Sequence, residues 1–487
     1  MPAAAKSKRT PSKQRTRTES DSMGEMRVPS DVLYGASTQR AVLNFPIAHR
    51  AVGWEIIHAF ALLKRDAAWT NHDLGKLDAR RMKLIAKACN EVLDMLENPD
   101  TRHDMMRHFP VDVFQTGSGT STNMNVNEVL SNIACIGAGA KMGAQDPIHP
   151  NDHVNMGQSS NDTFPTAMQI AAANHIKYQL IPSLKRLASA LRRKARAFDG
   201  IVKIGRTHLQ DATPIRLGQE FSGYTAQVEY AIDRAKAALK SLSHNLPIGG
   251  TAVGTGINTH PKFGRMIAAK LTKSTGVQFK EATNHFEAQA TRDCVCEAHG
   301  QLRTIAISLS KIASDIRFMG CGPRCGIHEL ELPAVQPGSS IMPGKVNPVL
   351  VESVMQVAMK VSGNDVAVGM GNLGGAGSMM ELSMAMPMTA DVLLDSITII
   401  GNVADVFAVG CIMGLKANKK AIAATVERSL MLGTALAPVL GYNEASHIAK
   451  AAYKEGCTIR EYCLAHDILP ADELDKLLDV SSMTHPH

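Results

Sequence analysis

Aromatic residues are scarce in this chain, whose 487 residues include 2 Trp, 7 Tyr and 12 Phe. The core must therefore be built mainly from Ala, Val, Ile, Leu and the 25 Met, side chains that pack well in contacts between helices. This composition argues against a β-sandwich or a propeller. With 45% apolar and 20% charged residues, the chain nevertheless has the composition of a globular protein.

Cysteine motifs are missing as well. The nine cysteines are an odd number, and no two of them form a Cys-x-x-Cys pair. Neither the spacing of metal ligands nor a disulfide framework is present, so we expect reduced thiols in a cytoplasmic protein. An iron–sulfur enzyme is disfavoured for the same reason.

A long hydrophobic run without charges is also missing. The most apolar stretch, residues 391–416, contains Asp395 and Asp405, whereas a membrane-spanning helix needs about 20 nearly uncharged residues. The N-terminus has neither the apolar segment of a secretory signal nor the amphipathic pattern of a transit peptide. We therefore expect no membrane segment and no export signal.

Positive charge is concentrated at the N-terminus. The formal net charge is +7, and the first 18 residues hold six Lys or Arg and no acid, so the rest of the chain is close to neutral. A nearly neutral body gives no reason to expect a face that binds nucleic acid or anionic membranes. We predict that residues 1–20 form a disordered basic tail.

Long helical periodicity is the strongest structural signal. Apolar residues recur every three or four positions along residues 221–242 and 295–316, and residues 392–409 are apolar nearly all round. Residues 163–198 show a similar pattern, which Pro182 is predicted to kink or interrupt. Four such helices predict an all-α bundle. Helices of about 30 residues are about 45 Å long, so we expect this bundle to associate laterally in a homo-oligomer.

These patterns divide the chain into domains. After the tail, we predict an N-terminal helical domain at residues 21–157 and the long-helix bundle at residues 158–416. A small helical domain follows at residues 417–487, where Pro470 and the acids after it indicate a helix start.

The segments between the helices have a different composition. Residues 115–125, 149–155, 249–258 and 336–348 are rich in Gly, Ser, Thr and Asn, residues that bind anions through backbone N–H groups and short hydroxyls. By contrast, the glycines of residues 369–374 match a dinucleotide motif but lack a preceding strand, so we interpret them as a helix junction.

A metal site is not predicted. His149 and His153 have the spacing of paired ligands on a helix, but Pro150 and Asn151 between them indicate a turn.

One segment resembles a known family. Residues 338–348, Gly-Ser-Ser-Ile-Met-Pro-Gly-Lys-Val-Asn-Pro, are similar to the signature of the fumarase and aspartase superfamily in its class II fumarase form. The similarity runs from Met23 to the C-terminus and includes residues 115–125, 158–165 and 205–211. It implies a three-domain all-α fold and a homotetramer whose central helices form a 20-helix bundle, with each active site shared by three subunits. The implied reaction is the reversible hydration of fumarate to (S)-malate in the tricarboxylic acid cycle, without a metal or an organic cofactor.

Removing a proton next to a carboxylate leaves an enediolate, and fixed hydrogen-bond donors lower the cost of its charge. The resemblance makes Ser339 the general base and His208 the acid/base partner that protonates the departing hydroxyl, with Glu352 orienting His208. Lys345 and Asn347 are of the donor types that an enediolate needs, and the resemblance makes them ligands of a substrate carboxylate.

The resemblance implies two further groups of residues. Substrate-binding positions match Ser118, Gly119, Thr120, Ser159, Ser160, Asn161, Thr207 and Ser340. A secondary anion site outside the catalytic pocket matches His149, Pro150, Asn151 and Asp152.

The main alternative is an aspartate ammonia-lyase, because loss of ammonia from aspartate passes through the same type of enediolate. Local sequence at His149-Pro150, residues 159–165 and Gly344 is similar to fumarases rather than aspartases. The sequence departs from the fumarase pattern at residues 379–383 and at Met156-Gly157. These two departures bear on the fine preference for substrate and not on the class of reaction.

Two non-enzymatic alternatives are an inactive structural homologue and a nucleic-acid binder that acts through its tail. Both are disfavoured because Ser339, Lys345, Asn347 and His208 are all present.

Overall fold

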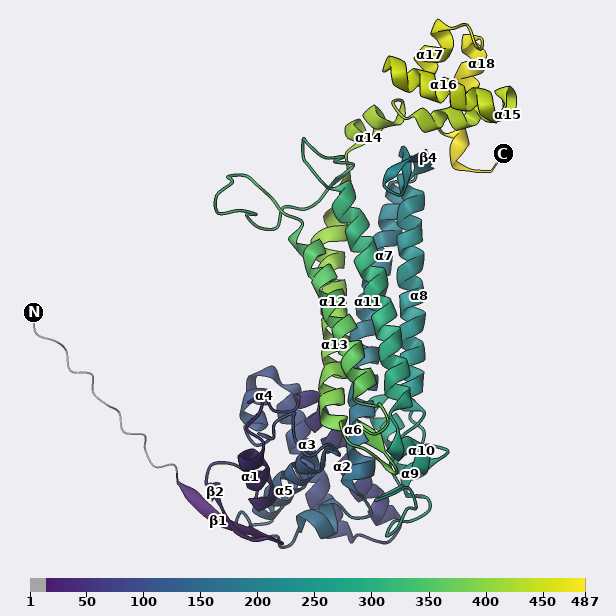
Figure 1. Ribbon diagram of the computed structural model, residues 1–487. Coiled ribbons are helices and arrows are strands. Elements are labelled where there is room, and N and C mark those ends of the chain that lie inside the picture. The colour runs from purple at the N-terminus through teal and green to yellow at the C-terminus, as the bar shows by residue number, and fades with distance from the viewer. Residues whose placement is uncertain (1–14, 487) are drawn as a thin grey trace, which may run out of the picture. The chain divides into compact units, whose positions relative to one another are not determined.

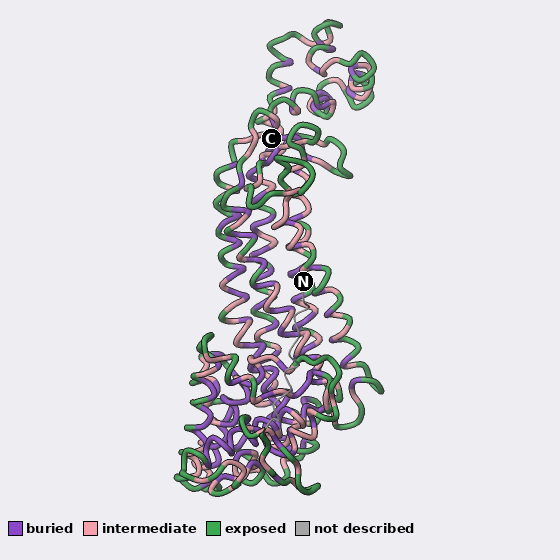
Figure 2. Tube along the Cα trace, turned by 90° about the vertical axis from the view of Figure 1, so that its left-hand side faces the viewer, coloured by how far each residue is buried: buried purple, intermediate pink, exposed green. Residues whose placement is uncertain are grey.

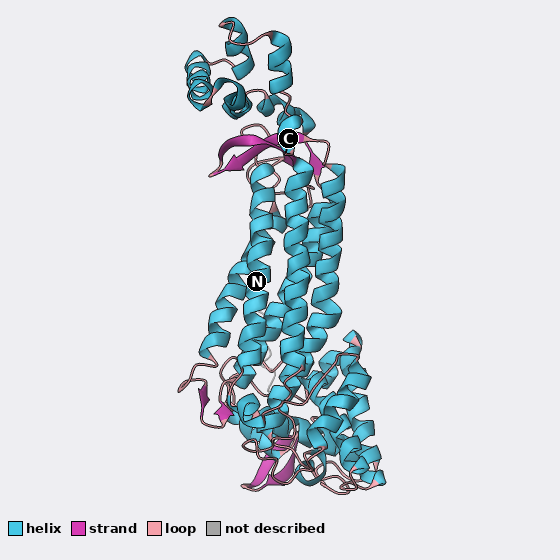
Figure 3. Cartoon of the chain, turned by 90° about the vertical axis from the view of Figure 1, so that its right-hand side faces the viewer, coloured by secondary structure: helices cyan, strands magenta, loops and turns pink. Residues whose placement is uncertain are grey.

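The computed structural model describes residues 15–486 and consists mainly of helices (Figures 1 and 3). Strands occur within these residues only in two-stranded sheets. The all-α prediction is therefore confirmed. Most of the predicted basic tail, residues 1–14, lies outside the described residues.

The end of the predicted tail forms a strand. Strand β1 (Thr16–Asp21) pairs antiparallel with β2 (Gly24–Pro29). The Arg17 guanidinium donates hydrogen bonds of 2.6 and 2.7 Å to the carbonyl oxygens of Pro29 and Val32 and forms an ion pair with Glu19. These bonds fix residues 16–20, which the sequence assigns to the tail, against the folded chain.

Contacts divide the chain into two compact units. The first unit contains residues 1–177, 237–300 and 363–397, and the second contains residues 178–236, 301–362 and 398–487. The predicted domain boundaries at residues 157 and 416 follow the sequence pattern and stay a prediction.

The helices and strands of the first unit, besides β1 and β2, are α1 (Ala36–Asn44), α2 (Trp54–Asp73), α3 (Ala79–Glu97), α4 (Pro99–Met106), α5 (Thr120–Gly137), the π-helix η1 (Pro150–Val154), α6 (Ser160–His175), α9 (Phe263–Thr275), α10 (His285–Ala290), β6 (Ser378–Met379) and β7 (Leu382–Ser383).

Helix α2 is the centre of the first unit. It packs against α3, α5, α6 and α9, and buried residues are dense along these helices (Figure 2). Phe60 of α2 meets Phe164 of α6 edge to face, with ring centroids 5.9 Å apart. Both tryptophans of the chain, Trp54 and Trp69, also lie on α2.

The second unit contains most of the long-helix segments, which run side by side in Figures 1 and 3. The contact division passes through α8, α11, α12 and α13. The helices and strands assigned wholly or partly to this unit are η2 (Ile176–Leu180), α7 (Ile181–Ala197), β3 (Val202–Thr207), β4 (Gln210–Arg216), α8 (Leu217–Ser243), α11 (Asp293–Met319), β5 (Leu330–Glu331), α12 (Val349–Met370), α13 (Met386–Val406), η3 (Phe407–Cys411), η4 (Ile412–Gly414), β8 (Lys416–Ala417), α14 (Lys419–Val426), η5 (Leu430–Leu436), α15 (Ala437–Leu440), α16 (Tyr442–Glu455), α17 (Ile459–Ala465), α18 (Ala471–Leu477) and η6 (Ser482–Thr484).

The predicted long helices are present. Residues 221–242 lie in α8, residues 295–316 lie in α11, and residues 392–409 begin in α13 and continue into the π-helix η3. The interruption predicted at Pro182 is also confirmed, because the π-helix η2 separates α6 from α7 there. Pro182 lies in the first turn of α7, where its missing N–H costs little.

Residues 386–414 are long and apolar enough to cross a membrane, by length and composition alone. Half of the most apolar window is buried inside the structure, as in the core helix of a helical bundle. Asp405 within this stretch pairs with Arg186 of α7 at 2.6 Å.

The C-terminal helices have a hydrophobic core of their own. Leu436, Ile448, Tyr462 and Leu474 are among its buried residues. Helix α18 begins directly after Pro470, with Asp472 and Glu473 in its first turn, as the sequence predicts.

Candidate active site

The first group of candidate residues lies at the start of α5, in the first unit. Gly119 caps the helix with a φ of 73°, and a Cβ at this position would lie 2.1 Å from the ring of Phe164. Only glycine therefore fits here. The hydroxyls of Ser118 and Thr120 are 2.7 Å apart, and Thr120 is 2.7 Å from the Ser160 hydroxyl. The structure thus brings three predicted substrate-binding hydroxyls into one hydrogen-bonded chain.

A capping box begins α6 beside this chain. The Ser159 hydroxyl accepts the N–H of Asn161, and the Ser159 N–H donates to Asp162 Oδ1 at 2.9 Å. The Asn161 amide donates to the Ala252 carbonyl oxygen at 2.8 Å. The predicted positions 159–161 are therefore fixed by a helix start and by the loop at residues 249–258.

Asp162 is a functional candidate that the sequence reasoning missed. It is fully buried, and its Oδ2 accepts the backbone N–H groups of Gly249 and Thr251 at 3.1 and 2.9 Å. Burial raises the pKa of Asp162 to about 6, although these N–H groups oppose the shift. The Ser-x-x-Asp spacing of a capping box, at residues 159–162, was the available signal.

A cavity of about 600 Å³ opens over these groups within the first unit. Thr120, Ser159 and Ser160 line it together with Asn151 and Asp152. The N-termini of α5 and α6, where backbone N–H groups have no helical partner, favour anions at such a place. The cavity thus has the polar lining that a dicarboxylate needs.

The residues predicted for the secondary anion site surround the π-helix η1. Asn151 and Asp152 are exposed at the cavity, and Pro150 is buried. His149 caps η1, because its Nδ1 accepts the N–H of Asp152 at 3.1 Å. The His153 ring in turn accepts the N–H of His149 at 2.8 Å. No cluster of three or more His, Cys, Asp or Glu side chains suited to a metal is found in the part of the chain that the structure describes.

The second group of candidates lies in the second unit, on the loop at residues 338–347. The Ser339 hydroxyl accepts the backbone N–H groups of Ile341 and Met342 at 3.2 and 2.9 Å. The Asn347 amide closes the loop by donating to the Gly338 carbonyl oxygen at 2.7 Å. Two N–H groups aimed at one oxygen stabilise negative charge on it. These two donors therefore favour negative charge on the Ser339 oxygen.

The other side chains of this loop face solvent. Ser340 and Lys345 are exposed, and so are the apolar side chains of Ile341 and Val346, at 84% and 49%. Exposed apolar residues beside a lysine and a serine are typical of a surface that another molecule covers.

Thr207 and His208 lie at the tip of the hairpin β3–β4. His208 and Leu209 both have positive φ, 54° and 61°, as a two-residue hairpin turn requires. Glu352 lies in the first turn of α12. No hydrogen bond or ion pair joins His208 to Glu352 or to Ser339 among residues 15–486. The structure therefore does not bring these three catalytic candidates into contact within one chain.

A buried ion cluster supports this hairpin, and the sequence reasoning did not find it. Lys203 of β3 is buried and lies 3.2 Å from Glu329, which is fully buried, and 3.5 Å from Glu220 of α8. Arg206 lies 3.8 Å from Glu329 and 3.1 Å from Asp211 of β4. Burial raises the pKa of Glu220, and the charge of Lys203 opposes that shift. No local sequence signal marks Glu329.

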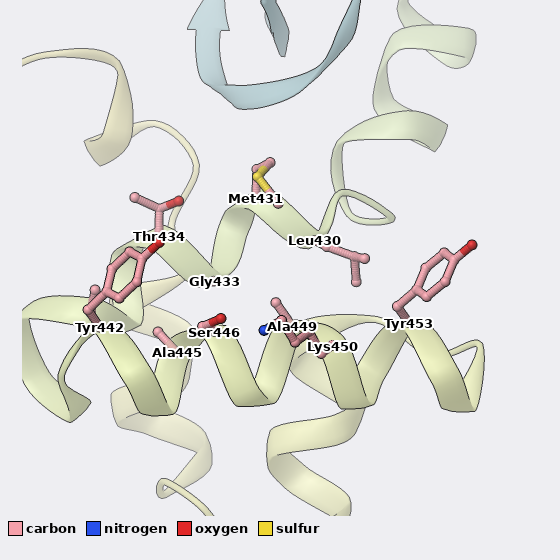
Figure 4. A pocket seen from close by; sticks show the side chains of 11 residues that line it. Leu430, Met431, Gly433, Thr434, Tyr442, Ala445, Ser446, Ala449, Lys450 and Tyr453 are labelled. Carbon is pink, nitrogen blue, oxygen red and sulfur yellow. The ribbon is translucent and has the colours of Figure 1, made fainter.

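A second cavity, of about 480 Å³, lies between η5 and α16 in the C-terminal helices (Figure 4). Most of its lining is apolar, with Leu430, Met431 and Ala445 among the lining residues. Its polar groups include the hydroxyls of Thr434 and Tyr442. Its lining also includes Lys450 and contains none of the residues predicted for the active site.

The departure from the fumarase pattern at residues 379–383 lies in the small hairpin β6–β7. Ser378 pairs with Ser383, and Met379 pairs with Leu382. Met380 at the turn has a φ of 51° and is 77% exposed. The glycines at residues 369–374 lie where α12 ends, so the predicted helix junction is confirmed.

Comparison with known proteins identifies the family. Residues 24–363 match the family described as Lyase, and residues 432–485 match the family described as Fumarase C C-terminus. The class II fumarate hydratase 2 of Bradyrhizobium diazoefficiens is 48% identical, over 99% of this chain and 100% of that protein. The mitochondrial fumarate hydratase of Saccharomyces cerevisiae is 49% identical, over 96% of this chain and 94% of that protein.

A solved structure shows the same fold. The class II fumarase of Schistosoma mansoni superposes with a TM-score of 0.92 at 37% identity, and the match covers 97% of this chain and 100% of that one. The resemblance inferred from residues 338–348 is therefore confirmed over the whole chain. The chain belongs to the lyase family that contains the class II fumarate hydratases.

Proposed function

We propose that this protein catalyses the reversible hydration of fumarate to (S)-malate, a step of the tricarboxylic acid cycle. The observation that carries the proposal is the Ser339 hydroxyl, which accepts two backbone N–H groups in a loop that also contains Lys345 and Asn347. This environment favours the serine alkoxide, which is basic enough to remove a proton next to a carboxylate. The similarity to class II fumarate hydratases over the whole chain supports the same reaction.

The proposed mechanism begins when Ser339 removes the proton from the carbon next to one carboxylate of malate. Lys345 and Asn347 bind that carboxylate and stabilise the enediolate. His208 protonates the departing hydroxyl, a role that suits an imidazole at neutral pH. Glu352 orients His208 by accepting a hydrogen bond from its ring N–H. No step requires a metal or an organic cofactor.

Further polar residues are proposed to hold the substrate. The remaining carboxylate binds at the cavity of the first unit, where the N-termini of α5 and α6 favour anions. The proposed substrate-binding residues are Ser118, Gly119, Thr120, Ser159, Ser160, Asn161, Thr207 and Ser340, and the proposed secondary anion site is formed by His149, Pro150, Asn151 and Asp152.

The proposed enzyme is a homotetramer in which three subunits contribute to each active site. His208 and Ser339 lie on exposed segments, and no hydrogen bond joins them within the described residues, which supports a site that draws on further copies of the chain. Helix α12 also exposes Met359, Val366 and Met370, at 67%, 65% and 55%, along one face. An apolar stripe of this kind favours a protein interface.

We also propose a cytoplasmic location, from the reduced thiols that the sequence predicts. The relatives include both bacterial proteins and proteins named as mitochondrial.

The test follows the absorbance of the fumarate double bond with malate and aspartate offered separately. The parent protein is expected to turn over malate and not aspartate. Ser339→Ala is expected to lose nearly all malate turnover. Ser353→Ala serves as a matched control, because the Ser353 hydroxyl donates to the Val349 carbonyl oxygen of its own helix. Faster turnover of aspartate than of malate would support an aspartate ammonia-lyase instead.

A further inference from the structure

A buried ammonium group that the proposed mechanism does not use lies on helix α2. The side chain of Lys64 is fully buried. Its Nζ donates hydrogen bonds of 2.9 Å to Asn123 Oδ1 and to Asn155 Oδ1. Burying an ammonium group is costly even when it is hydrogen-bonded, and most buried lysines are paired with a carboxylate. A lysine held by two amides therefore calls for an explanation.

The two amides belong to segments that carry candidate substrate-binding residues. Asn123 lies one turn after Thr120 on α5. Asn155 lies just before Ser159, and its Nδ2 donates to the Gln158 carbonyl oxygen at 3.1 Å. The two amides also contact each other, because Asn123 Nδ2 donates to Asn155 Oδ1 at 3.2 Å. The ammonium of Lys64 thus ties the start of α5 to the turn that leads into α6.

Asn123 and Asn155 also line the cavity of about 600 Å³, next to Thr120, Ser159 and Ser160. Lys64 therefore lies directly behind the cavity wall, separated from it by the side chains that it binds. A charge in the protein interior is screened far less than one at the surface. A positive group in this position attracts an anion in the cavity.

We propose that Lys64 is a positioning residue for the dicarboxylate substrate, because it joins the two substrate-binding segments and supplies positive charge behind the cavity. This inference rests on the proposed function. Lys64 acts through Asn123 and Asn155 and does not touch the reacting atoms.

The charge of Lys64 depends on its surroundings. Burial lowers the pKa of Lys64 to about 7, and the carboxylate of Asp162 on α6 opposes this shift. From α3, Cys89 faces Lys64, and burial raises the pKa of this thiol to about 12, so it is neutral. The side chains of Asn123 and Asn155, which accept hydrogen bonds from Lys64, are neutral amides. Because a lysine is positive below its pKa, its attraction for the substrate is present at slightly acidic pH and lost as the pH rises above about 7.

The main experiment compares Lys64→Met with Arg65→Met in steady-state kinetics on malate. Methionine has a similar length and no charge, so Lys64→Met removes both amide contacts and the positive charge. We expect KM to rise about tenfold or more, because a hydrogen bond to a charged group is lost at two segments, and kcat to change less than KM. Arg65→Met removes a neighbouring positive charge that lies against Asp66, Asn90 and the Trp69 ring, and KM should stay within about twofold.

The pH dependence gives a readout that a merely structural role would not produce. In the parent, KM for malate is expected to rise between about pH 6 and pH 9 as Lys64 loses its proton. In Lys64→Met, KM is expected to be high and to lack this rise. A folded Lys64→Met variant with the KM and pH profile of the parent would overturn the proposal.

A second variant keeps the test valid if Lys64→Met does not fold. Asn155→Leu leaves the ammonium in place and removes its link to the turn before Ser159, together with the amide's own bonds to Asn123 and to the Gln158 carbonyl oxygen. KM is expected to rise here too, and an unchanged KM together with a flat parent pH profile would contradict the proposal. If the proposed function itself is wrong, the parent will show no malate turnover, so the two failures are distinguishable.

Discussion

The two groups of candidate residues differ in how completely the chain itself fixes them. In the first unit, Thr120 and Ser160 belong to a hydrogen-bonded chain that Asp162 and Lys64 support from the interior. In the second unit, the tip of the β3–β4 hairpin and most of the side chains at residues 338–347 are exposed. The first group is preformed within one chain, whereas the second group presents the proposed catalytic side chains on exposed segments. The proposed substrate-binding residues and the proposed proton-transfer residues are therefore positioned by different means.

The largest expected effect concerns the exposed group. His208→Asn is expected to lower kcat for malate dehydration by about 10²–10⁴-fold, because hydroxide is a poor leaving group that needs a proton as the bond breaks. Ammonium leaves already protonated and needs no such acid, and the variant should gain no useful aspartate deamination. Steady-state rates on both substrates measure this, with the exposed His103→Asn as a matched control. An unimpaired His208→Asn would remove this residue from the mechanism.

A mixing experiment tests whether the exposed group needs other copies of the chain. His208→Asn and Ser339→Ala are each expected to be nearly inactive. If different subunits supply the two residues, unfolding and refolding an equal mixture should restore about a quarter of the parent activity, because that share of sites receives both intact residues by random assembly. Unmixed variants taken through the same cycle are the control. No recovery in verified hybrids would place both residues in the same subunit.

The preformed group is expected to contribute to stability as well as to binding. Asp162→Ala leaves the N–H groups of Ser159, Gly249 and Thr251 without their carboxylate. The Thr251 bond is buried and the other two are partly buried, and a buried donor left unsatisfied costs about 1–3 kcal/mol. The free energy of unfolding should therefore fall by more than about 1 kcal/mol. Urea denaturation measures this. Asp211→Ala, on the exposed hairpin, should cost less than about 1 kcal/mol, because the Asp211 side chain that pairs with Arg206 is about half exposed to solvent.

The smallest expected effects are at the N-terminus. Removing residues 1–14 is expected to leave activity and melting temperature unchanged, because that segment has no core-forming residues beyond Ala and Met1. Removing residues 1–18 also deletes Arg17 and its bonds to Pro29 and Val32, so the melting temperature should fall by a few degrees. Thermal melts of the two truncations compare them directly. Identical melts would show that strand β1 adds no stability.

The sequence predicted most of the fold because the relevant signals are local. The periodicity of residues 221–242 and 295–316 and the break at Pro182 depend on neighbours along one helix. The serine and lysine of residues 338–348 were likewise recognisable as a motif. Glu329, Asp162 and Lys64 were not found, because their importance depends on burial and on partners far away in the sequence. The strand at residues 16–20 was missed for the same reason. Nothing in the sequence distinguishes Arg17 from the other basic residues of the tail, but its guanidinium donates to the carbonyl oxygens of residues 29 and 32.

The placement of the aromatic residues gives the two units separate optical signals. Both tryptophans lie on α2 in the first unit, and six of the seven tyrosines lie in the second. The Arg102 guanidinium of α4 lies 4.0 Å from the centroid of the Trp54 ring on α2. The fluorescence emission of Trp54 therefore depends on how these two helices pack. Tryptophan fluorescence therefore reports the folding of the first unit, whereas tyrosine absorbance reports mainly the second. Unlabelled protein is sufficient to determine whether the two units melt in one transition or in two.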